Sequence, residues 1–285
     1  MTHQPTVALL GTGTMGAGMA RNIAAAGLPL RVWNRSRDKA QALADTGAQV
    51  AGSVVDAVSG ADLVVTMLFD ADSVAATMEQ AREGLGPDTV WVQQTTVGVA
   101  GHERLAALAG DLGVTFVDAP VLGTRKPAED GALVVLASGP EEVRPQVQPL
   151  FDAIGSRTLW VGPAGAGSRL KLAANAWVLT VVEGIAESLA LARALGLDPA
   201  LFLEAVSGGA LDAPYVQLKG SAMLNGDFAP AFGLDGAAKD AGLVVEAARD
   251  AGVDLAVLEA VRGHIDRALA AGHGDKDMAA TFLEH

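Results

Sequence analysis

The chain has 285 residues, half of them apolar, and its 33 acidic and 20 basic side chains give a formal net charge of −13. This composition is sufficient to bury a substantial core and excludes disorder as the main state, while the acidic balance excludes a nucleic-acid-binding role. The absence of Cys excludes disulfides and thiolate chemistry and is consistent with a cytoplasmic protein.

The first residues, Met1 to Pro5, are polar and lead directly into an apolar run. They lack the basic start and apolar segment of a signal peptide. No uninterrupted apolar stretch approaches the roughly 20 residues that a membrane-spanning helix requires. We therefore expect neither a targeting segment nor a membrane partner.

From Val7 to Val161, short apolar runs alternate with stretches of helical periodicity. The runs are rich in β-branched residues, which indicates strands buried on both faces. Predicted strands cover residues 7–10, 30–33, 63–68, 90–93, 115–117, 133–137 and 158–161. Predicted helices cover residues 14–25, 36–44, 71–83, 99–109 and 141–153. The alternation predicts a Rossmann-type, doubly wound α/β domain with a parallel sheet and helices on both faces.

Beyond a glycine-rich segment at residues 162–167, the sequence predicts only helices, over residues 168–195, after Asp198, and over residues 232–251 and 255–271. The first of these is apolar almost all round and must be covered on most sides. We therefore predict two domains: 1–163, of the Rossmann type, and 164–285, an all-helical substrate and dimerisation domain. A second copy of the chain would complete the cover in a homodimer. The predicted dimer buries Trp177, Val181 and Ile185.

A GxGxxG pattern follows the first predicted strand and opens the first predicted helix. Its glycines permit a tight turn, close approach of a pyrophosphate, and close packing of helix on strand, and the helix N-terminus presents N–H groups to the phosphates. This context predicts a dinucleotide site. The predicted cofactor contacts in the loop are Gly11, Thr12, Gly13, Thr14, Met15 and Gly16.

The end of the second predicted strand indicates which dinucleotide binds. NAD enzymes usually have a carboxylate there, which holds the ribose 2′-hydroxyl and would repel a 2′-phosphate. This chain has Asn34, followed by Arg35, Ser36 and Arg37. Arg and Ser side chains suit a phosphate, so we predict NADP(H) in preference to NAD(H), bound through Asn34, Arg35 and Ser36. Arg37 is equally well explained as a solvated residue at a helix start.

Four segments carry a resemblance that extends over essentially the whole chain. They read GTGTMGAGMARN at 11–22, DAPVLGTRKPAEDGALVVLASG at 118–139, GAGSRLKLAAN at 165–175, and KD at 239–240, preceded by Phe232. With these segments the chain resembles the β-hydroxyacid dehydrogenases, such as 3-hydroxyisobutyrate dehydrogenase and tartronate semialdehyde reductase. The portion KPAEDG is most similar to the glyoxylate and succinic semialdehyde reductases of that family.

The resemblance implies that Lys171 is the catalytic lysine and that Asn175 and Asp240 complete the catalytic set. Lys171 and Asn175 are four residues apart on one predicted helix and so share a face. An ammonium within hydrogen-bonding reach can donate a proton to the oxygen of a carbonyl that receives a hydride. The resemblance further implies that Lys239 contacts the cofactor and Phe232 the substrate.

Three more positions are candidates at the nicotinamide end. Thr96 matches a Ser-Thr of the family at the end of a strand, and its hydroxyl is predicted to hold the nicotinamide ribose or the substrate. Met67 and Leu68 follow the third predicted strand and are predicted to line the nicotinamide side. Each has a simpler interpretation, since Thr96 could cap a turn and Met67 and Leu68 could belong to the core.

Two departures from the family pattern concern the substrate. The family usually has Ser-Gly-Gly after Asp-Ala-Pro-Val, and here the predicted substrate contacts are Leu122, Gly123 and Thr124. Leu122 cannot replace the hydrogen bond of the serine to a substrate carboxylate, so a larger or more apolar carbonyl compound becomes an alternative. Ala174 replaces the first of two family asparagines.

The histidines suggest no metal chemistry. They are His3, His102, His264, His273 and His285, and they show neither ligand spacing nor a carboxylate at a matching offset. We therefore predict no metal site.

The sequence thus predicts an NADPH-dependent oxidoreductase that acts on a small aldehyde or keto acid, or on the corresponding hydroxy acid. Two alternatives stay open. An imine reductase shares the Val-Trp-Asn-Arg segment but usually has another residue at the position of Lys171. A non-catalytic NADP(H)-binding scaffold would be expected to lack that lysine altogether.

Overall fold

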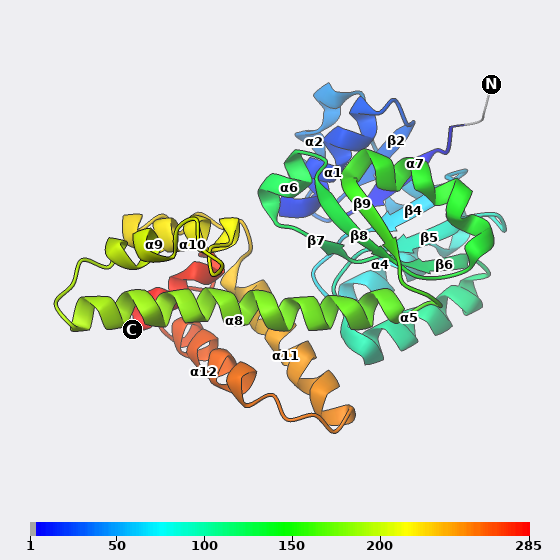
Figure 1. Cartoon of the computed structure of the whole chain (residues 1–285). Coiled ribbons are helices and arrows are strands. Elements are labelled where there is room, and N and C mark those ends of the chain that lie inside the picture. Colours follow the sequence, from blue (N-terminus) through cyan, green and yellow to red (C-terminus); the bar gives the residue numbers. More distant parts are fainter. Residues whose placement is uncertain (1–3) are drawn as a thin grey trace. The chain divides into compact units, whose positions relative to one another are not determined.

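The computed structural model describes residues 4–285, so His3 lies outside the described residues. The chain divides into two compact units, the first ending at Lys171 and the second running from Leu172 to His285 (Figure 1). The first unit carries all the strands of the described residues, and the second is helical. The predicted fold class, a Rossmann-type sheet followed by a helical region, is confirmed.

The main sheet of unit 1 is parallel throughout and has the strand order β3-β2-β1-β4-β5-β6. The order reverses between β1 and β4, which is the point where such sheets bind ligands at their carboxyl edge. Its strands are β1 (Val7–Leu10), β2 (Leu30–Trp33), β3 (Gln49–Val50), β4 (Leu63–Thr66), β5 (Val90–Gln93) and β6 (Thr115–Asp118). The two-residue strand β3 is too short to appear as a periodic run in the sequence.

Helices cover both faces of this sheet and create two cores. One core joins Leu9, Val32 and Val65 to helix α1, and the other joins Ala8, Leu10 and Val64 to α3, α4 and α5. Adjacent residues of each strand therefore face opposite cores, as the continuous apolar runs predict. The helices are α1 (Thr14–Ala25), α2 (Arg37–Gln41), α3 (Val54–Val58), α4 (Ala71–Ala81) and α5 (Gly98–Leu112), with 3₁₀ turns η1 (Ala44–Thr46) and η2 (Arg82–Gly84).

The rest of unit 1 forms a second, three-stranded sheet, β7-β8-β9. The predicted strands at 133–137 and 158–161 belong to this sheet and not to the main one, and β7 pairs antiparallel with β8. The sequence prediction of one continuous parallel sheet is corrected here, because apolar runs show burial but not the partner strand. Its elements are β7 (Val121–Leu122), α6 (Arg125–Glu129), β8 (Leu133–Ala137), η3 (Glu141–Val143), α7 (Arg144–Ile154) and β9 (Gly155–Trp160).

Five helices and a 3₁₀ turn make up the remainder of the described chain. They are α8 (Ala166–Ala194), α9 (Ala200–Val206), α10 (Pro214–Asn225), α11 (Leu234–Asp250), α12 (Ala256–Ala270) and η4 (Met278–Glu284). The first six residues of α8 belong to unit 1 and the rest to unit 2. The predicted helices at 168–195, 232–251 and 255–271 agree with α8, α11 and α12 within two residues at each end.

Helix α8 is long and apolar enough to cross a membrane when judged by length and composition alone. The sequence prediction considered uninterrupted apolar runs, whereas α8 intersperses small and polar residues. One such helix is weak evidence, because the central helix of a soluble domain meets the same criteria. Two polar side chains of α8, Asn175 and Glu183, are buried and bonded to α11 and α12 respectively, as expected of a central helix in a helical domain.

A buried ion pair organises the helical unit. Lys219 of α10 and Asp277 are 4 % and 3 % exposed, and their Nζ and Oδ1 atoms are 2.5 Å apart. Asp277 also accepts backbone hydrogen bonds from Ala231, Phe232 and Ala279. The carboxylate therefore joins α10, the segment before α11, and η4.

We expect Lys219→Ala to lower the free energy of unfolding by about 3–5 kcal/mol, because it leaves the Asp277 carboxylate buried without a counter-charge. Urea denaturation followed by circular dichroism measures this change. The control is Arg262→Ala, which removes an exposed ion pair with Asp266 of the same unit and should cost less than about 1 kcal/mol. Equal effects of the two substitutions would contradict the structural importance of the Lys219 pair.

Candidate active site

The glycine loop lies between β1 and α1 and has the shape of a phosphate cradle. Gly11 adopts φ +109°, and a Cβ there would lie 2.2 Å from the carbonyl oxygen of Met67. A Cβ at Gly16 would lie 2.0 Å from the carbonyl oxygen of Gly11. A Cβ at Gly13 would meet nothing within 4 Å. Gly11 and Gly16 are thus required by the fold, whereas the space above Gly13 is open for a ligand.

Thr12 is a second indication of a ligand site. The residue is 3 % exposed, and its hydroxyl oxygen has no hydrogen-bond partner in the described part of the chain. Buried polar groups are normally paired. An orphaned hydroxyl beside an open glycine fits a loop that receives a diphosphate.

The side chain of Asn34 forms hydrogen bonds with the backbone of the glycine loop and of the segment after β2. Its Oδ1 accepts the N–H of Thr12 at 3.0 Å, and its Nδ2 donates to the carbonyl of Ser36 at 3.0 Å. Asn34 therefore ties the end of β2 to the glycine loop. The next two residues, Arg35 and Ser36, have exposed side chains. Within residues 4–285, neither side chain forms an ion pair or a hydrogen bond.

At the carboxyl edge of β4 and β5, hydroxyl and amide groups fix the backbone. The hydroxyl of Thr95 accepts the N–H of Leu68 at 2.9 Å, and Gln93 bonds both backbone groups of Thr95 at 2.7 Å. Met67, Leu68 and Thr96 are half-buried at this edge. The hydroxyl of Thr95 therefore joins the ends of β4 and β5.

The first turn of α8 is anchored by the carboxylate of Asp118, which is fully buried at the end of β6. Its Oδ2 accepts the N–H of Ser168 at 2.8 Å, and its Oδ1 accepts the Ser168 hydroxyl at 2.7 Å. The Ser138 hydroxyl donates to the same carboxylate at 3.1 Å and accepts the N–H of Gly167 at 3.0 Å. A carboxylate at a helix N-terminus is favoured by the free N–H groups and the helix dipole.

This anchor fixes Lys171, one turn further along α8. Its Nζ donates to the carbonyl oxygen of Val121 at 2.8 Å. Asp118 and Val121 are three residues apart, so one short segment holds both the start of the helix and the ammonium. The half-buried Lys171 is therefore set within a defined polar contact and does not extend freely into solvent.

Within unit 2, Asn175 and Asp240 lie together. They are 2 % and 3 % exposed, and Nδ2 of Asn175 donates to Oδ2 of Asp240 at 2.7 Å. The Lys239 ammonium is 2.9 Å from Oδ1 of Asp240. Phe232, which precedes α11, lies against Gly236 of that helix, because a Cβ at Gly236 would be 3.0 Å from the ring. Asp240 thus joins Asn175, through a hydrogen bond, to Lys239, through an ion pair.

The predicted substrate segment runs through β7 into α6. Leu122 is half-buried and paired with Val134. Gly123 has φ +127°, and a Cβ there would lie 2.7 Å from Leu133 and 2.9 Å from Pro127. The flanking cations are engaged: Arg125 pairs with Glu129 at 2.8 Å, and Lys126 pairs with Asp130.

The sequence prediction overlooked Asp118, Ser168 and Asp277. Asp118 stands in the quoted Asp-Ala-Pro-Val segment, and Ser168 stands at the predicted start of the long helix. The preference for Ser near helix N-termini could have suggested Ser168, but its contact with Asp118, 50 positions away, depends on the tertiary fold. Asp277 has no comparable local signal, because its partners are backbone groups and a lysine 58 positions away.

Two family models match almost the whole chain. The NAD-binding domain of 6-phosphogluconate dehydrogenase matches residues 6–162, and the NAD-binding domain of NADP-dependent 3-hydroxyisobutyrate dehydrogenase matches residues 165–283. A glyoxylate/succinic semialdehyde reductase of Arabidopsis thaliana is 32 % identical over 97 % of this chain and 78 % of its own length.

Solved structures agree with these matches. A Mycobacterium tuberculosis 3-hydroxyisobutyrate dehydrogenase, determined with L-serine, superposes with a TM-score of 0.88 at 28 % identity, covering 99 % of both chains. A Salmonella typhimurium 3-hydroxyisobutyrate dehydrogenase gives 0.92 at 25 % identity over 99 % of this chain and 100 % of its own. The chain belongs to the β-hydroxyacid dehydrogenase family. It is an NAD(P)-dependent oxidoreductase, as the sequence predicts.

Imine reductases share the fold less closely. An enzyme from Myxococcus stipitatus superposes with a TM-score of 0.65 at 22 % identity over 99 % of this chain. At that identity the likeness shows the fold alone, and the hydroxyacid and semialdehyde enzymes fit the chain better.

The second and third glycines of the loop, Gly13 and Gly16, allow cofactor binding and folding to be tested separately. We expect Gly13→Ala to change the unfolding temperature by about 2 °C or less, because its Cβ enters open space, while the Kd for NADPH rises about tenfold or more. Gly16→Ala should instead destabilise the fold by about 1–3 kcal/mol, because its Cβ overlaps the backbone of Gly11. Thermal unfolding and NADPH fluorescence titration measure both effects. Unchanged NADPH affinity in Gly13→Ala would refute the assigned cradle.

Proposed function

We propose that the protein is an NADPH-dependent reductase of a small aldehyde or keto acid, with Lys171 as the proton donor. The anchored ammonium of Lys171 is the observation that carries this proposal. A helix held by Asp118 at its first turn presents the lysine at a fixed position, which general acid catalysis requires. The non-catalytic alternative gains no support from a chain that keeps this arrangement.

The preference for NADP(H) is supported by the end of β2. The carboxylate that would select NAD(H) is replaced by Asn34, whose side chain holds the glycine loop. Arg35 and Ser36 are exposed beside it and suit a 2′-phosphate. We assign Arg35 and Ser36 to the phosphate contact and Asn34 to the shape of the loop.

A nicotinamide cofactor bound at this site would supply the hydride in reduction and accept it in oxidation. In the direction of reduction, Lys171 donates a proton to the carbonyl oxygen as negative charge develops there. In the direction of oxidation the same amine, when neutral, accepts the proton. We assign Asn175 to hold or orient the reacting oxygen and Asp240 to orient Asn175, because its carboxylate accepts the amide N–H.

Residues 1–163 are proposed as the cofactor domain and residues 164–285 as the substrate and dimerisation domain. The two family models, which end at 162 and begin at 165, support this division. The relatives named as semialdehyde and hydroxyisobutyrate enzymes support an aldehyde or hydroxy acid as substrate. A cytoplasmic location is proposed from the absence of Cys.

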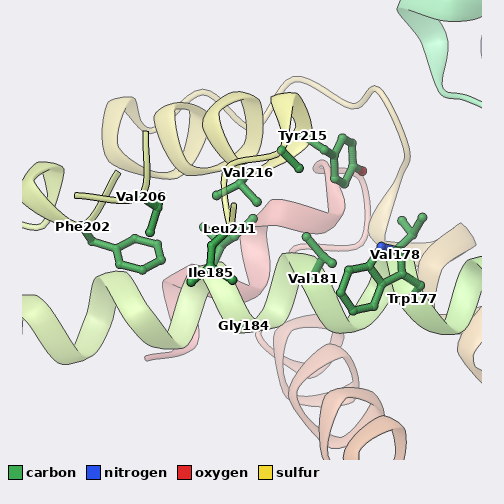
Figure 2. Close-up of a pocket in the computed structure, with 11 residues that line it drawn as sticks. Trp177, Val178, Val181, Gly184, Ile185, Phe202, Val206, Leu211, Tyr215 and Val216 are labelled. Atoms are coloured by element: carbon green, nitrogen blue, oxygen red, sulfur yellow. The ribbon is translucent and has the colours of Figure 1, made fainter. Parts of the chain in front are cut away.

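A homodimer is proposed on an apolar groove in unit 2. The groove has a volume of about 390 Å³ and lies between α8 and the segment from α9 to α10. Figure 2 shows Phe202, Val206 and Val216 facing α8 across it. Trp177 and Leu211 at this groove are 70 % and 80 % exposed, which is unusual for large apolar side chains. Of the three predicted interface residues, Trp177 is exposed, Val181 is half-buried and Ile185 is buried by its own chain at 3 % exposure. We therefore propose Trp177 and Leu211 as the apolar anchors of the interface.

The proposed chemistry is tested by NADPH oxidation with glyoxylate, succinic semialdehyde, a long-chain aldehyde and a cyclic imine, with NADH in parallel. We expect turnover of a carbonyl substrate with NADPH preferred. Lys171→Ala should lower kcat about 10²–10⁴-fold with an unchanged Kd for NADPH, because it removes only the proton donor. Turnover of the imine alone, or a Lys171→Ala variant as active as wild type, would contradict the proposed function.

The homodimer is tested by light scattering at micromolar concentration. Wild type should have twice the mass of the chain, and the double substitution of Trp177 and Leu211 by Ser should weaken association by at least about tenfold, because it removes two exposed apolar anchors. Leu283→Ser, which changes an apolar residue of η4 with 44 % exposure, is the control. A monomeric wild type would rule out the dimer.

A further inference from the structure

Three potential metal ligands converge in unit 2. They are Glu183 of α8, His264 of α12, and His285. Oε1 of Glu183 lies 2.8 Å from Nδ1 of His264 and 2.6 Å from Nε2 of His285, and these two nitrogens are 3.1 Å apart. The sequence predicts no metal site because the histidines show no ligand spacing. The fold brings together residues up to 102 positions apart.

Burial makes the charge of this cluster costly. Glu183 is 4 % exposed, and the side chains of His264 and His285 are 19 % and 11 % exposed. Within residues 4–285, Glu183 pairs with these two imidazoles and with no Lys or Arg side chain. A buried carboxylate needs a compensating charge. A proton on one imidazole or a cation among the three side chains would supply it.

The geometry admits a cation. Zinc binds His nitrogen at about 2.0–2.1 Å and carboxylate oxygen at about 2.0–2.2 Å. The three donor atoms lie within 3.1 Å of one another, so a point at those distances from all three exists just outside their plane. The other ring nitrogen of His264, Nε2, is 3.9 Å from Oε1 of the exposed Glu187, beyond hydrogen-bond distance. A proton on Nε2 would leave the Nδ1 lone pair for the metal.

We propose that Glu183, His264 and His285 form a binding site for a divalent transition metal ion, with zinc favoured by the two imidazoles and one carboxylate. Water would complete a tetrahedral set. The site would fasten α8, α12 and the segment after η4 to one another. Glu183 is eight residues from Asn175, about 12 Å along α8, so the ion serves the stability of the helical unit and not the proton transfer.

The test is a zinc titration of the chelator-treated full chain, prepared without added histidines and followed by isothermal calorimetry and thermal unfolding. We expect one zinc ion per chain with a Kd of about 1 µM or lower, and an unfolding temperature that rises with zinc concentration. Cobalt(II) should give the visible absorption of a tetrahedral site. Glu183→Gln and His264→Ala should weaken zinc binding about 100-fold or more.

The control is His273→Ala, which removes another half-buried histidine of the same unit, paired with Glu284, and should leave zinc binding unchanged. His285→Ala, at the edge of the cluster, keeps the test valid if the two central variants fail to fold, and should weaken binding at least tenfold. Absence of zinc binding at 100 µM, or equal affinity in wild type and these ligand variants, would overturn the proposal.

Discussion

The buried carboxylate of Asp118 is the contact on which the candidate site depends. The segment before α8 is rich in glycine, with positive φ at Gly162 and Gly165, so the chain itself does not fix where the helix begins. Asp118 does, by accepting both the N–H and the hydroxyl of Ser168. The close fit of Gly167, whose Cβ would lie 2.3 Å from the carbonyl oxygen of Leu136, leaves little freedom. These contacts therefore determine the position of Lys171 on α8.

The glycine loop, which follows the carboxyl end of β1, is held in a similar way. Gly11 and Gly16 are dictated by backbone contacts within the fold, and Asn34 holds the loop through the N–H of Thr12. Two features are not required by the fold: the open space at Gly13, and the hydroxyl of Thr12, which has no hydrogen-bond partner among residues 4–285. Features that the packing of the fold does not require are expected at functional sites. Gly11 and Gly16 are therefore structural glycines, whereas Gly13 is the glycine that a ligand would require.

The sequence predicts the helices and strands that have a long, regular hydrophobic pattern. It does not predict which strands pair with each other when they are far apart in the chain. The strands β1, β2 and β5 and the helix α1 agree with prediction to the residue, because each is a continuous run with a clear boundary. The second sheet was not separated from the first, since β8 and β9 have the apolar character of any buried strand. The short elements β3, α3 and α6 have two to five residues, fewer than a period-based argument needs.

For the candidate site, the sequence motifs identified the glycine loop and Lys171. The contacts of Asp118 and the convergence of Glu183 with His264 depend on tertiary structure, so no local pattern predicts them.

The change at Leu122 bears most directly on the substrate. A small carboxylate held by a serine hydroxyl needs a donor at that position, and Leu122 provides only apolar surface. Arg125 and Lys126 are adjacent, but their charges are engaged by Glu129 and Asp130 within the same short helix. An ion pair of this exposed kind is worth less than about 1 kcal/mol, so a substrate anion could draw either cation away at little cost. Under the proposed function, the segment therefore offers a substrate the apolar surface of Leu122 and two cations held only by weak ion pairs.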